Sequence, residues 1–355
     1  MKKVLFLFSL LFLGKGEINI IKKIIKALPL LWLLSSLILA ICGFYGYTVL
    51  LRPENTIKQA QQITHPIQSE KEIKEIQQTT IGKATYNENQ IQPVTPTDYA
   101  EAQLSYEALV NQWGIGSLYI PSSGIYSKIL AGMSNDNLMV GLGTYYPNQL
   151  LGKGNYVLMA HNLVQGGGVL RNLPQSSVES TIYATDFNKI YEYEITTNKI
   201  VNQSEGKLLD IPQEGDSPLM TIFRCEGGLH TANRALIQAR YVRSYSAENG
   251  SHDIKQALGL ETTRNKTVNK QRLNDQQATS TNRTETAKES ITPDKDTKKA
   301  KQTNKIEWHF TEKKAIYSNF QVFSILVFQL ANAYPILIGL VFLVGLSSCI
   351  LLNRV

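Results

Sequence analysis

The sequence predicts an all-β fold: a small closed β-barrel of seven to eight strands with short helical turns, flanked by two transmembrane helices. Two observations lead to this prediction. The middle of the 355-residue chain alternates strand-like segments with clusters of glycine and proline, which is typical of a barrel. Each end holds an uncharged apolar stretch long enough to cross a bilayer, which takes roughly 20 helical residues.

The amino-terminal apolar stretch covers residues 27–51 and contains no charged residue. We expect a transmembrane helix here rather than a buried core helix, because charged residues stand directly at both of its ends. Residues 1–26 then form a cytoplasmic basic segment. Positive charge favours the cytoplasmic side, and only Arg52 follows the stretch directly, whereas six lysines precede it: Lys2, Lys3, Lys15, Lys22, Lys23 and Lys26.

The carboxy-terminal residues 315–353 carry no charge at all. We expect a membrane-proximal segment followed by a second transmembrane helix at about 330–352. Two spans would place both termini in the cytoplasm and everything between them on the extracellular face of the cell membrane. Lys313 and Lys314 oppose this orientation, because they would lie on the outer side.

Two polar regions separate the predicted spans from the folded domain. Residues 52–113 suggest an extracellular stalk or neck, helical from Asn55 to Gln78 and interrupted at Pro93 and Pro96. Residues 244–314 suggest a disordered polar linker, because only 13 of the 63 residues from 244 to 306 are apolar. So few apolar residues cannot offset the entropy cost of ordering the chain. A tether near an anionic surface is the alternative to a plain linker.

One folded domain remains, over residues 114–243. Its strand-like segments are rich in β-branched and aromatic residues or alternate in polarity: 117–121, 125–130, 155–162, 181–186, 189–202, 219–225 and 234–243. Only residues 135–139 and 169–173 look like single helical turns.

Composition excludes several classes of protein. Three cysteines, two of them in the apolar ends, are too few for a disulfide framework, and without a C-x-x-C pair a thiolate zinc site is not expected. The net charge of +7 comes from scattered lysines and arginines, which suits a membrane protein better than a nucleic-acid binder. We expect no cofactor, no metal site and no nucleic-acid partner.

Three side chains at strand ends are candidates for chemistry. Cys225 ends the segment LMTIFRC beside Gly227 and Gly228, where its thiol would face a groove, although a lone cysteine is more often structural. His161 ends the segment YVLMAHN and taken singly is more often structural too. Arg234 begins the strand after Cys225, with Arg240 six residues on and on the same face. A surface salt bridge is the simpler role for either arginine.

The order of these motifs resembles that of the sortases. The resemblance covers about residues 116–242: a strand ending in Ala-His-Asn at His161, a later strand of the form Thr-Ile-x-x-Cys from Thr221 to Cys225, and an arginine, Arg234, opening the next strand. It implies a sortase-like barrel with Cys225 as the nucleophile, His161 as the acid/base, Arg234 as the binding and oxyanion group, and Thr221 in substrate binding.

Sortases are membrane-anchored cysteine transpeptidases of Gram-positive bacteria, and the resemblance implies the same partners and chemistry here. The enzyme would cleave an LPxTG-like sorting motif of a surface protein after Thr, through a thioacyl intermediate. It would then transfer the protein to the amine of a cell-wall precursor. The barrel looks most like the housekeeping class.

Some features depart from that class. A carboxy-terminal span resembles the pilin-polymerising class, which joins pilins through a lysine, but residues 53–113 lack the Asp-Pro motif that this class carries. Arg224 stands where the family has Thr, so a catalytically degenerate surface domain is a further alternative. An L,D-transpeptidase is disfavoured, because its Ser-His-Gly-Cys motif is absent.

Overall fold

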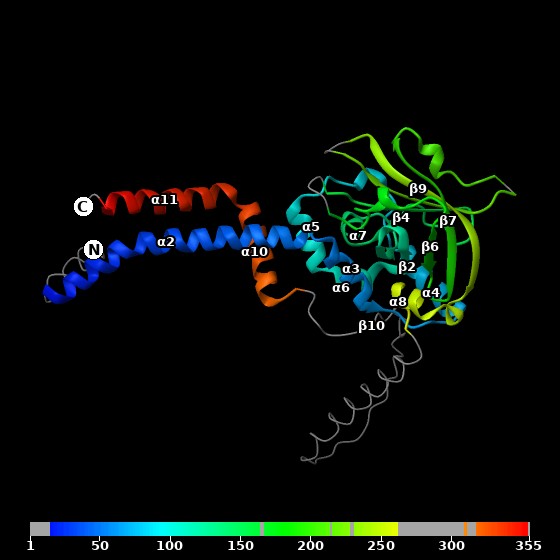
Figure 1. Cartoon of the computed structure of the whole chain (residues 1–355), viewed down its shortest axis with the longest axis horizontal. Helices are drawn as coiled ribbons and strands as arrows, with labels where there is room; N and C mark the ends of the chain where they lie inside the picture. Colours follow the sequence, from blue (N-terminus) through cyan, green and yellow to red (C-terminus); the bar gives the residue numbers. More distant parts are fainter. Residues whose placement is uncertain are drawn as a thin grey trace, which may run out of the picture. The chain divides into compact units, whose positions relative to one another are not determined.

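The computed structural model describes residues 15–163, 167–213, 215–227, 231–261, 309–310 and 317–353 (Figure 1). The chain divides into two compact units. One unit contains the two ends, Met1–Leu50 and Tyr317–Val355, and the other contains Leu51–Ile316. Each unit is described by itself.

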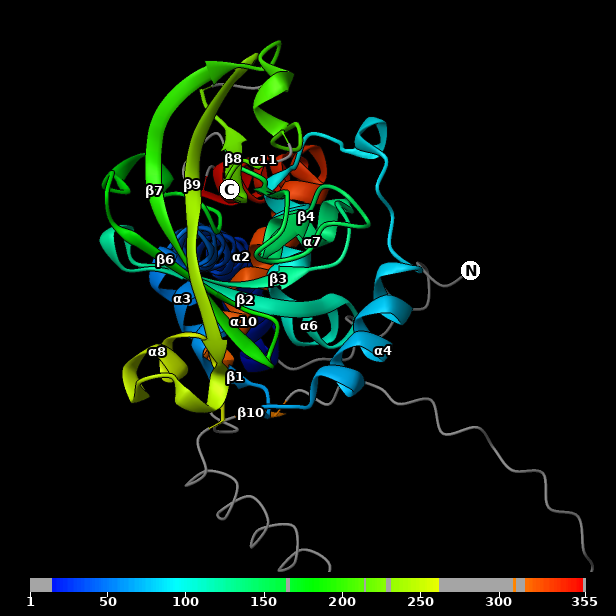
Figure 2. The same cartoon turned by 90° about the vertical axis from the view of Figure 1, so that its right-hand side faces the viewer.

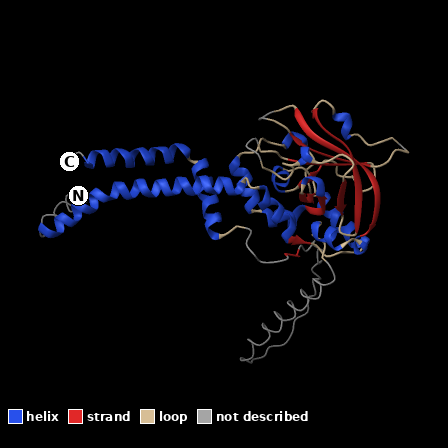
Figure 3. Ribbon diagram, viewed as in Figure 1, coloured by secondary structure: helices blue, strands red, loops and turns tan. Residues whose placement is uncertain are grey.

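The larger unit is built on a closed barrel, which confirms the central prediction. Among the described residues, eight strands close in the order β2-β3-β4-β5-β8-β9-β7-β6 (strands red in Figure 3). Closure occurs because β2 pairs with β3 on one side and with β6 on the other. The strands are β2 Gly114–Ile120, β3 Ile125–Leu130, β4 Leu142–Thr144, β5 Asn155–Ala160, β6 Thr181–Thr185, β7 Lys189–Asn202, β8 Leu219–Cys225 and β9 Asn233–Ser246.

Strands β5 and β8 are buried on both faces, which explains why they are apolar almost throughout. Side chains at even positions, such as Leu158 and Ile222, pack in the barrel interior. Side chains at odd positions, such as Val157 and Phe223, pack in a second cluster outside the barrel. The 3₁₀ helix η4, Gly206–Leu209, lies in the segment between β7 and β8 and covers this second cluster.

Helices cover the barrel on another side, so the prediction of an all-β fold is too narrow. Residues 52–113, expected as a stalk, form the helices α3 Pro53–Gln62, α4 Glu70–Ile81, α5 Pro96–Leu104 and α6 Tyr106–Trp113 (labelled in Figure 1). Tyr99, Tyr106 and Val110 of α5 and α6 are buried in one cluster with Leu130 and Met139. Because these few apolar residues recur at helical spacing, a largely polar segment can still pack on the barrel.

The folded region also extends beyond the predicted boundary at residue 243. Strand β9 continues to Ser246, followed by η5 Ala247–Asn249 and α8 His252–Ala257. Ala247, Leu258 and Leu260 are buried in the core, so this part of the chain belongs to the folded unit. The short strands β1 Ile63–Thr64 and β10 His309–Phe310 pair with each other. The rest of the predicted linker, 262–308 and 311–316, lies outside the described residues.

In the unit formed by the ends, helix α2 covers Lys15–Leu50. Its part Ala27–Leu50 is, among the described residues, the one helical stretch long and apolar enough to cross a membrane by length and composition. Residues 1–14 of the predicted cytoplasmic segment lie outside the described residues.

The second predicted span, at about 330–352, is not confirmed. Helix α10 Asn319–Ala333 ends before Tyr334, and helix α11 Pro335–Asn353 begins at a proline, which has no N–H with which to continue the first helix. Among the described residues, the apolar stretch found within α11 is Gly339–Ser348.

Helix α10 crosses α2 in close contact (Figure 1). A Cβ atom at Gly46 would collide with the backbone of Ser324, so only glycine permits this approach. Aromatic rings flank the contact, with Tyr45 and Phe320 centred 5.6 Å apart and Tyr47 and Phe328 5.3 Å apart.

Candidate active site

The strand register brings the three predicted catalytic residues to one end of the barrel. Strand β5 runs parallel to β8, with Ala160 opposite Arg224, so the next residues, His161 and Cys225, follow side by side. Strand β9 runs antiparallel to β8, with Arg234 opposite Cys225. Because neighbouring strands lie about 4.8 Å apart, the three residues are close together in space, and this end of the strands is the candidate site.

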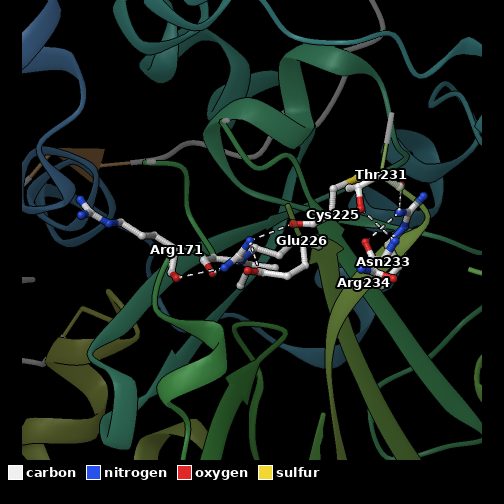
Figure 4. A network of polar contacts seen from close by, with 8 residues as sticks. Arg171, Cys225, Glu226, Thr231, Asn233 and Arg234 are labelled. Atoms are coloured by element: carbon white, nitrogen blue, oxygen red, sulfur yellow. Dashed lines mark hydrogen bonds and ion pairs between the residues drawn. The ribbon is translucent and has the colours of Figure 1, made fainter. Parts of the chain in front are cut away.

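Cys225 carries a free, half-buried thiol at the last position of β8. It is at an odd position, on the face of the strand that it shares with Phe223, as the alternation of the sequence predicts. Figure 4 shows Cys225 between two polar networks, with Glu226 and Arg171 on one side and Thr231, Asn233 and Arg234 on the other. The thiol is thus half-buried, while Arg224 binds the backbone carbonyl of Cys225.

His161 is attached to helix α7, Asn135–Val140, by two hydrogen bonds. Its backbone N–H donates to the carbonyl of Leu138 at 2.9 Å, and its Nε2 lies 3.1 Å from Oδ1 of Asn135. Burial lowers the pKa of His161 to about 4, because desolvation disfavours the charged imidazolium. The resting imidazole is therefore neutral at pH 7.

Arg234 lies opposite Cys225 in the backbone register, but its guanidinium binds elsewhere. Its Nη1 donates to the carbonyls of Thr231 and Asn233 at 2.8 and 2.9 Å, and its Nη2 donates to Oε1 of Gln203 at 2.9 Å. Within the described part of the chain, no hydrogen bond joins Arg234 to Cys225.

Arg240 lies at the far end of the same strands. It is opposite Leu219, six residues before Cys225, which is a separation of roughly 20 Å along the strand. Its Nη2 forms an exposed ion pair with Glu194 at 3.2 Å.

Thr221 is fully buried in the wall of the barrel. Its hydroxyl donates to Oδ1 of Asn155 at 2.9 Å and accepts from Nε2 of Gln238 at 3.3 Å. Asn155 and Gln238 also donate to the carbonyl of Leu208 in η4, at 3.1 and 2.9 Å. This network, which the sequence analysis did not include, fixes η4 over the outer face of β8. The sequence does contain an indication of this network, because Asn155, Thr221 and Gln238 are polar residues in largely apolar strands.

Arg224 has a structural role that sequence reasoning missed. Its side chain is almost completely buried, with Nε donating to the carbonyl of Leu170 at 2.9 Å and Nη1 donating to the carbonyl of Cys225 at 2.8 Å. Nη1 also pairs with Oε2 of Glu226 at 2.7 Å. Burial lowers the pKa of Arg224. The guanidinium thus ties the segment between β5 and β6 to the strand that carries Cys225.

The described residues contain no cluster of three or more His, Cys, Asp or Glu side chains suited to a metal ion. The polar groups gathered around Cys225 can position a thiol, a neutral imidazole and guanidinium groups. Such a set suits acyl transfer to and from a thiol.

Comparison with known proteins identifies the barrel. Residues 118–242, which run from β2 into β9, match the family model described as a sortase domain. The chain is 24% identical over 151 residues to sortase A of Listeria monocytogenes, covering 42% of this chain and 65% of that protein. It is 28% identical over 120 residues to sortase A of Bacillus anthracis, covering 34% and 57%. The chain therefore spans less than two thirds of the length of these two relatives.

A solved structure of Listeria monocytogenes sortase A is also similar, with a TM-score of 0.38 and 21% identity over 42% of this chain and 99% of that one. Sortases are in general cysteine transpeptidases anchored to the membrane. The family model covers the strands that carry Cys225, His161 and Arg234, so the barrel of this chain is similar to a sortase domain.

Proposed function

We propose that this chain cleaves an LPxTG-like sorting motif after Thr and transfers the surface protein to an amine of a cell-wall precursor. One observation carries the proposal: Cys225 ends β8 and His161 directly follows the parallel strand β5 at the same level, with Arg234 opposite Cys225. This arrangement supports a thiol nucleophile with an acid/base beside it.

In the first half-reaction, His161 accepts the thiol proton of Cys225. The sulfur attacks the Thr carbonyl of the sorting motif, so that a C–S bond forms. His161 then gives the proton to the departing Gly nitrogen as the C–N bond breaks, and a thioacyl enzyme remains. A resting neutral imidazole supports this order, because it can accept the proton before it donates it.

In the second half-reaction, the incoming amine attacks the thioacyl carbon. His161 takes a proton from that amine, a new amide bond forms, and the C–S bond breaks to release Cys225, which regains the proton. Arg234 stays charged throughout and stabilises the oxygen charge of both tetrahedral intermediates or holds the substrate backbone. To do so, its guanidinium would exchange a contact with Thr231 or Gln203 for the substrate.

For Thr221 we propose an indirect part in substrate binding. Its hydrogen bonds to Asn155 and Gln238 support η4, the 3₁₀ helix above the outer face of β8. That face also carries Cys225, so a shifted η4 would change the surroundings of the thiol.

We propose the same two-span membrane arrangement as the sequence predicts: a cytoplasmic segment at 1–26, a first span at 27–51 and a second span within 315–353. The folded domain between the spans includes residues on both sides of 114–243. The apolar helix Ala27–Leu50 supports the first span, and the uncharged α11 supports the second. The catalytic domain would face the cell exterior, where sorting signals and wall precursors are found. A pilin lysine is the alternative nucleophile.

The full chain, purified in detergent, tests the proposal when it is incubated with sorting peptides and candidate amines. Mass spectrometry is expected to show a thioacyl adduct on Cys225 and a ligated product whose mass identifies the amine. Cys225→Ala is expected to abolish both while the domain stays folded by circular dichroism. Cleavage retained in this variant would overturn the proposal, and a folded wild-type chain without any adduct would support a degenerate domain instead.

A further inference from the structure

We propose that Asn135 is a positioning residue that sets the protonated nitrogen of His161, and that a strap from the amino-terminal side of the barrel holds Asn135 in turn. The strap is residues 84–92, between α4 and α5, and includes the 3₁₀ helix η1 Glu88–Gln90. The inference rests on the proposed function of His161 as the acid/base.

Asn135 occupies a well-fixed place at the start of α7. Ser134 caps this helix, with its hydroxyl accepting from the N–H of Asn137 at 3.4 Å. Asn137 in turn donates to the carbonyl of Ala131 at 2.9 Å, which ties the helix to the end of β3. His161 is bound to α7 through both its backbone and its ring. The position of the ring therefore follows that of the helix.

The hydrogen bonds of Asn135 determine which of its amide atoms faces His161. Oδ1 of Asn135 accepts from the backbone N–H of Gln92 at 3.0 Å, and a backbone N–H can only donate. The same atom lies 3.1 Å from Nε2 of His161. An amide turned the other way would set its NH₂ against the N–H of Gln92. The atom between them is therefore the oxygen.

An amide oxygen accepts but does not donate, so Nε2 of His161 must carry a hydrogen. In the neutral imidazole, Nδ1 then holds the lone pair, and in the described residues Nδ1 has no hydrogen-bond partner. Nδ1 is thus the nitrogen that exchanges the proton with thiol and amine. The bond from Nε2 to Asn135 strengthens when the ring becomes charged, so Asn135 favours the imidazolium that burial disfavours.

The strap follows α4 in Figure 2, and hydrogen bonds attach it to the barrel. The carbonyl of Thr85 accepts from the N–H of Met133 at 2.9 Å, and Oε2 of Glu88 accepts from the hydroxyl of Tyr145 at 2.6 Å. Gly132, with a φ of 77°, leaves room for the backbone of Thr85, which a Cβ atom there would displace. The strap ends on Asn135 through Gln92 and lies outside residues 118–242, which match the family model.

The test compares three variants of the full chain in detergent. Asn135→Ala removes the acceptor, and Gln92→Pro removes the backbone donor of the strap together with an exposed side chain. Asn137→Ala is the matched control, because it removes an amide from the same helix without touching His161. ¹⁵N NMR of labelled histidine, assigned with His161→Gln, reports the tautomer, and pH profiles of transpeptidation report kcat and KM.

We expect His161 to be protonated on Nε2 in the wild-type chain and to be a mixture of tautomers in Asn135→Ala. The kcat of Asn135→Ala should fall about tenfold or more, the scale of one hydrogen bond to a charged group, with little change in KM. Gln92→Pro should change the tautomer of His161 and kcat in the same direction as Asn135→Ala, but to a smaller extent. Asn137→Ala should lower stability but leave the tautomer and the shape of the pH profile unchanged.

Two outcomes would overturn the inference: a wild-type tautomer and pH profile in Asn135→Ala, or a wild-type ring protonated on Nδ1. A chain that lacks transpeptidation altogether would instead contradict the proposed function. The NMR measurement still decides the role of Asn135 in that case, so the two failures are distinguishable.

Discussion

Next to Cys225, two arginines use hydrogen bonds to hold backbone carbonyls. Arg224 binds the carbonyls of Leu170 and Cys225, and Arg234 binds those of Thr231 and Asn233. The resting site is therefore organised for positioning. Catalytic contacts of Arg234 would form only with substrate bound.

The two arginines of β9 differ in their distance from Cys225, which leads to the first prediction at this scale. Arg234→Lys keeps the charge but loses the planar fork, so its turnover should fall by about a hundredfold, the scale of one oxyanion donor. Arg240→Lys should change turnover by about threefold or less, because its exposed ion pair with Glu194 is distant. Both are measured with one sorting peptide. A larger loss of turnover in Arg240→Lys than in Arg234→Lys would mean that the catalytic role has been assigned to the wrong arginine.

His161 leads to a prediction about stability and pH. Its pKa is about 4 in the folded chain, against the ordinary histidine value of 6.5, so between these values the unfolded chain binds the extra proton. Stability is thus unaffected above pH 6.5 and is lost as the pH falls. By pH 5 the loss should be about 1–2 kcal/mol. Urea unfolding at pH 7 and pH 5 should show a smaller difference in His161→Gln, and an equal difference would refute this account.

At the scale of elements, the segment between β5 and β6 depends on β8 through one buried side chain. Arg224→Met would leave the carbonyl of Leu170 unpaired and Glu226 without its partner. We expect the free energy of unfolding to fall by about 1–3 kcal/mol, the scale for leaving a buried hydrogen-bonding group unpaired, since Glu226 is 30% exposed. The double variant Arg224→Met/Glu226→Gln should recover part of this, because no unpaired charge remains. Equal losses in both, measured by urea unfolding, would show that the ion pair is not responsible.

At the scale of the whole molecule, the barrel needs residues on both sides of the predicted 114–243 domain. A fragment 114–243 lacks Tyr99, Ala247 and Leu260 from the core, and it cuts the pairing of β9 with β7 at Tyr245. We expect the melting temperature of this fragment, measured by circular dichroism, to be well below that of the fragment 51–261. Similar melting temperatures would mean that helices α3–α6 contribute little to stability.

Membrane topology yields the last prediction. Six lysines ahead of the first apolar stretch and an uncharged tail of 39 residues predict that both termini are cytoplasmic. A reporter that works only outside the cell should be silent when fused after Val355 and active when inserted after Ser280. Strong activity after Val355 would mean that α11 does not span the membrane.

The sequence by itself determined the local elements and the positions of the candidate residues on them. Alternation and turn residues predict the bounds of β3, β7 and β8 as observed, and they place Cys225 and His161 at strand ends. Such features depend on neighbours close in the chain, and periodicity records them directly.

Only the tertiary structure decided the partners across the barrel. Asn135 beside His161, Arg224 on the carbonyl of Leu170, and the packing of α5 and α6 against β3 all join residues far apart in sequence. Their contacts depend on which strands pair and in what register, and no local pattern encodes that pairing. The pattern of residues 52–113, polar with a few spaced apolar residues, fits a free stalk as well as packed helices. These residues form packed helices because the barrel offers an apolar surface that they cover.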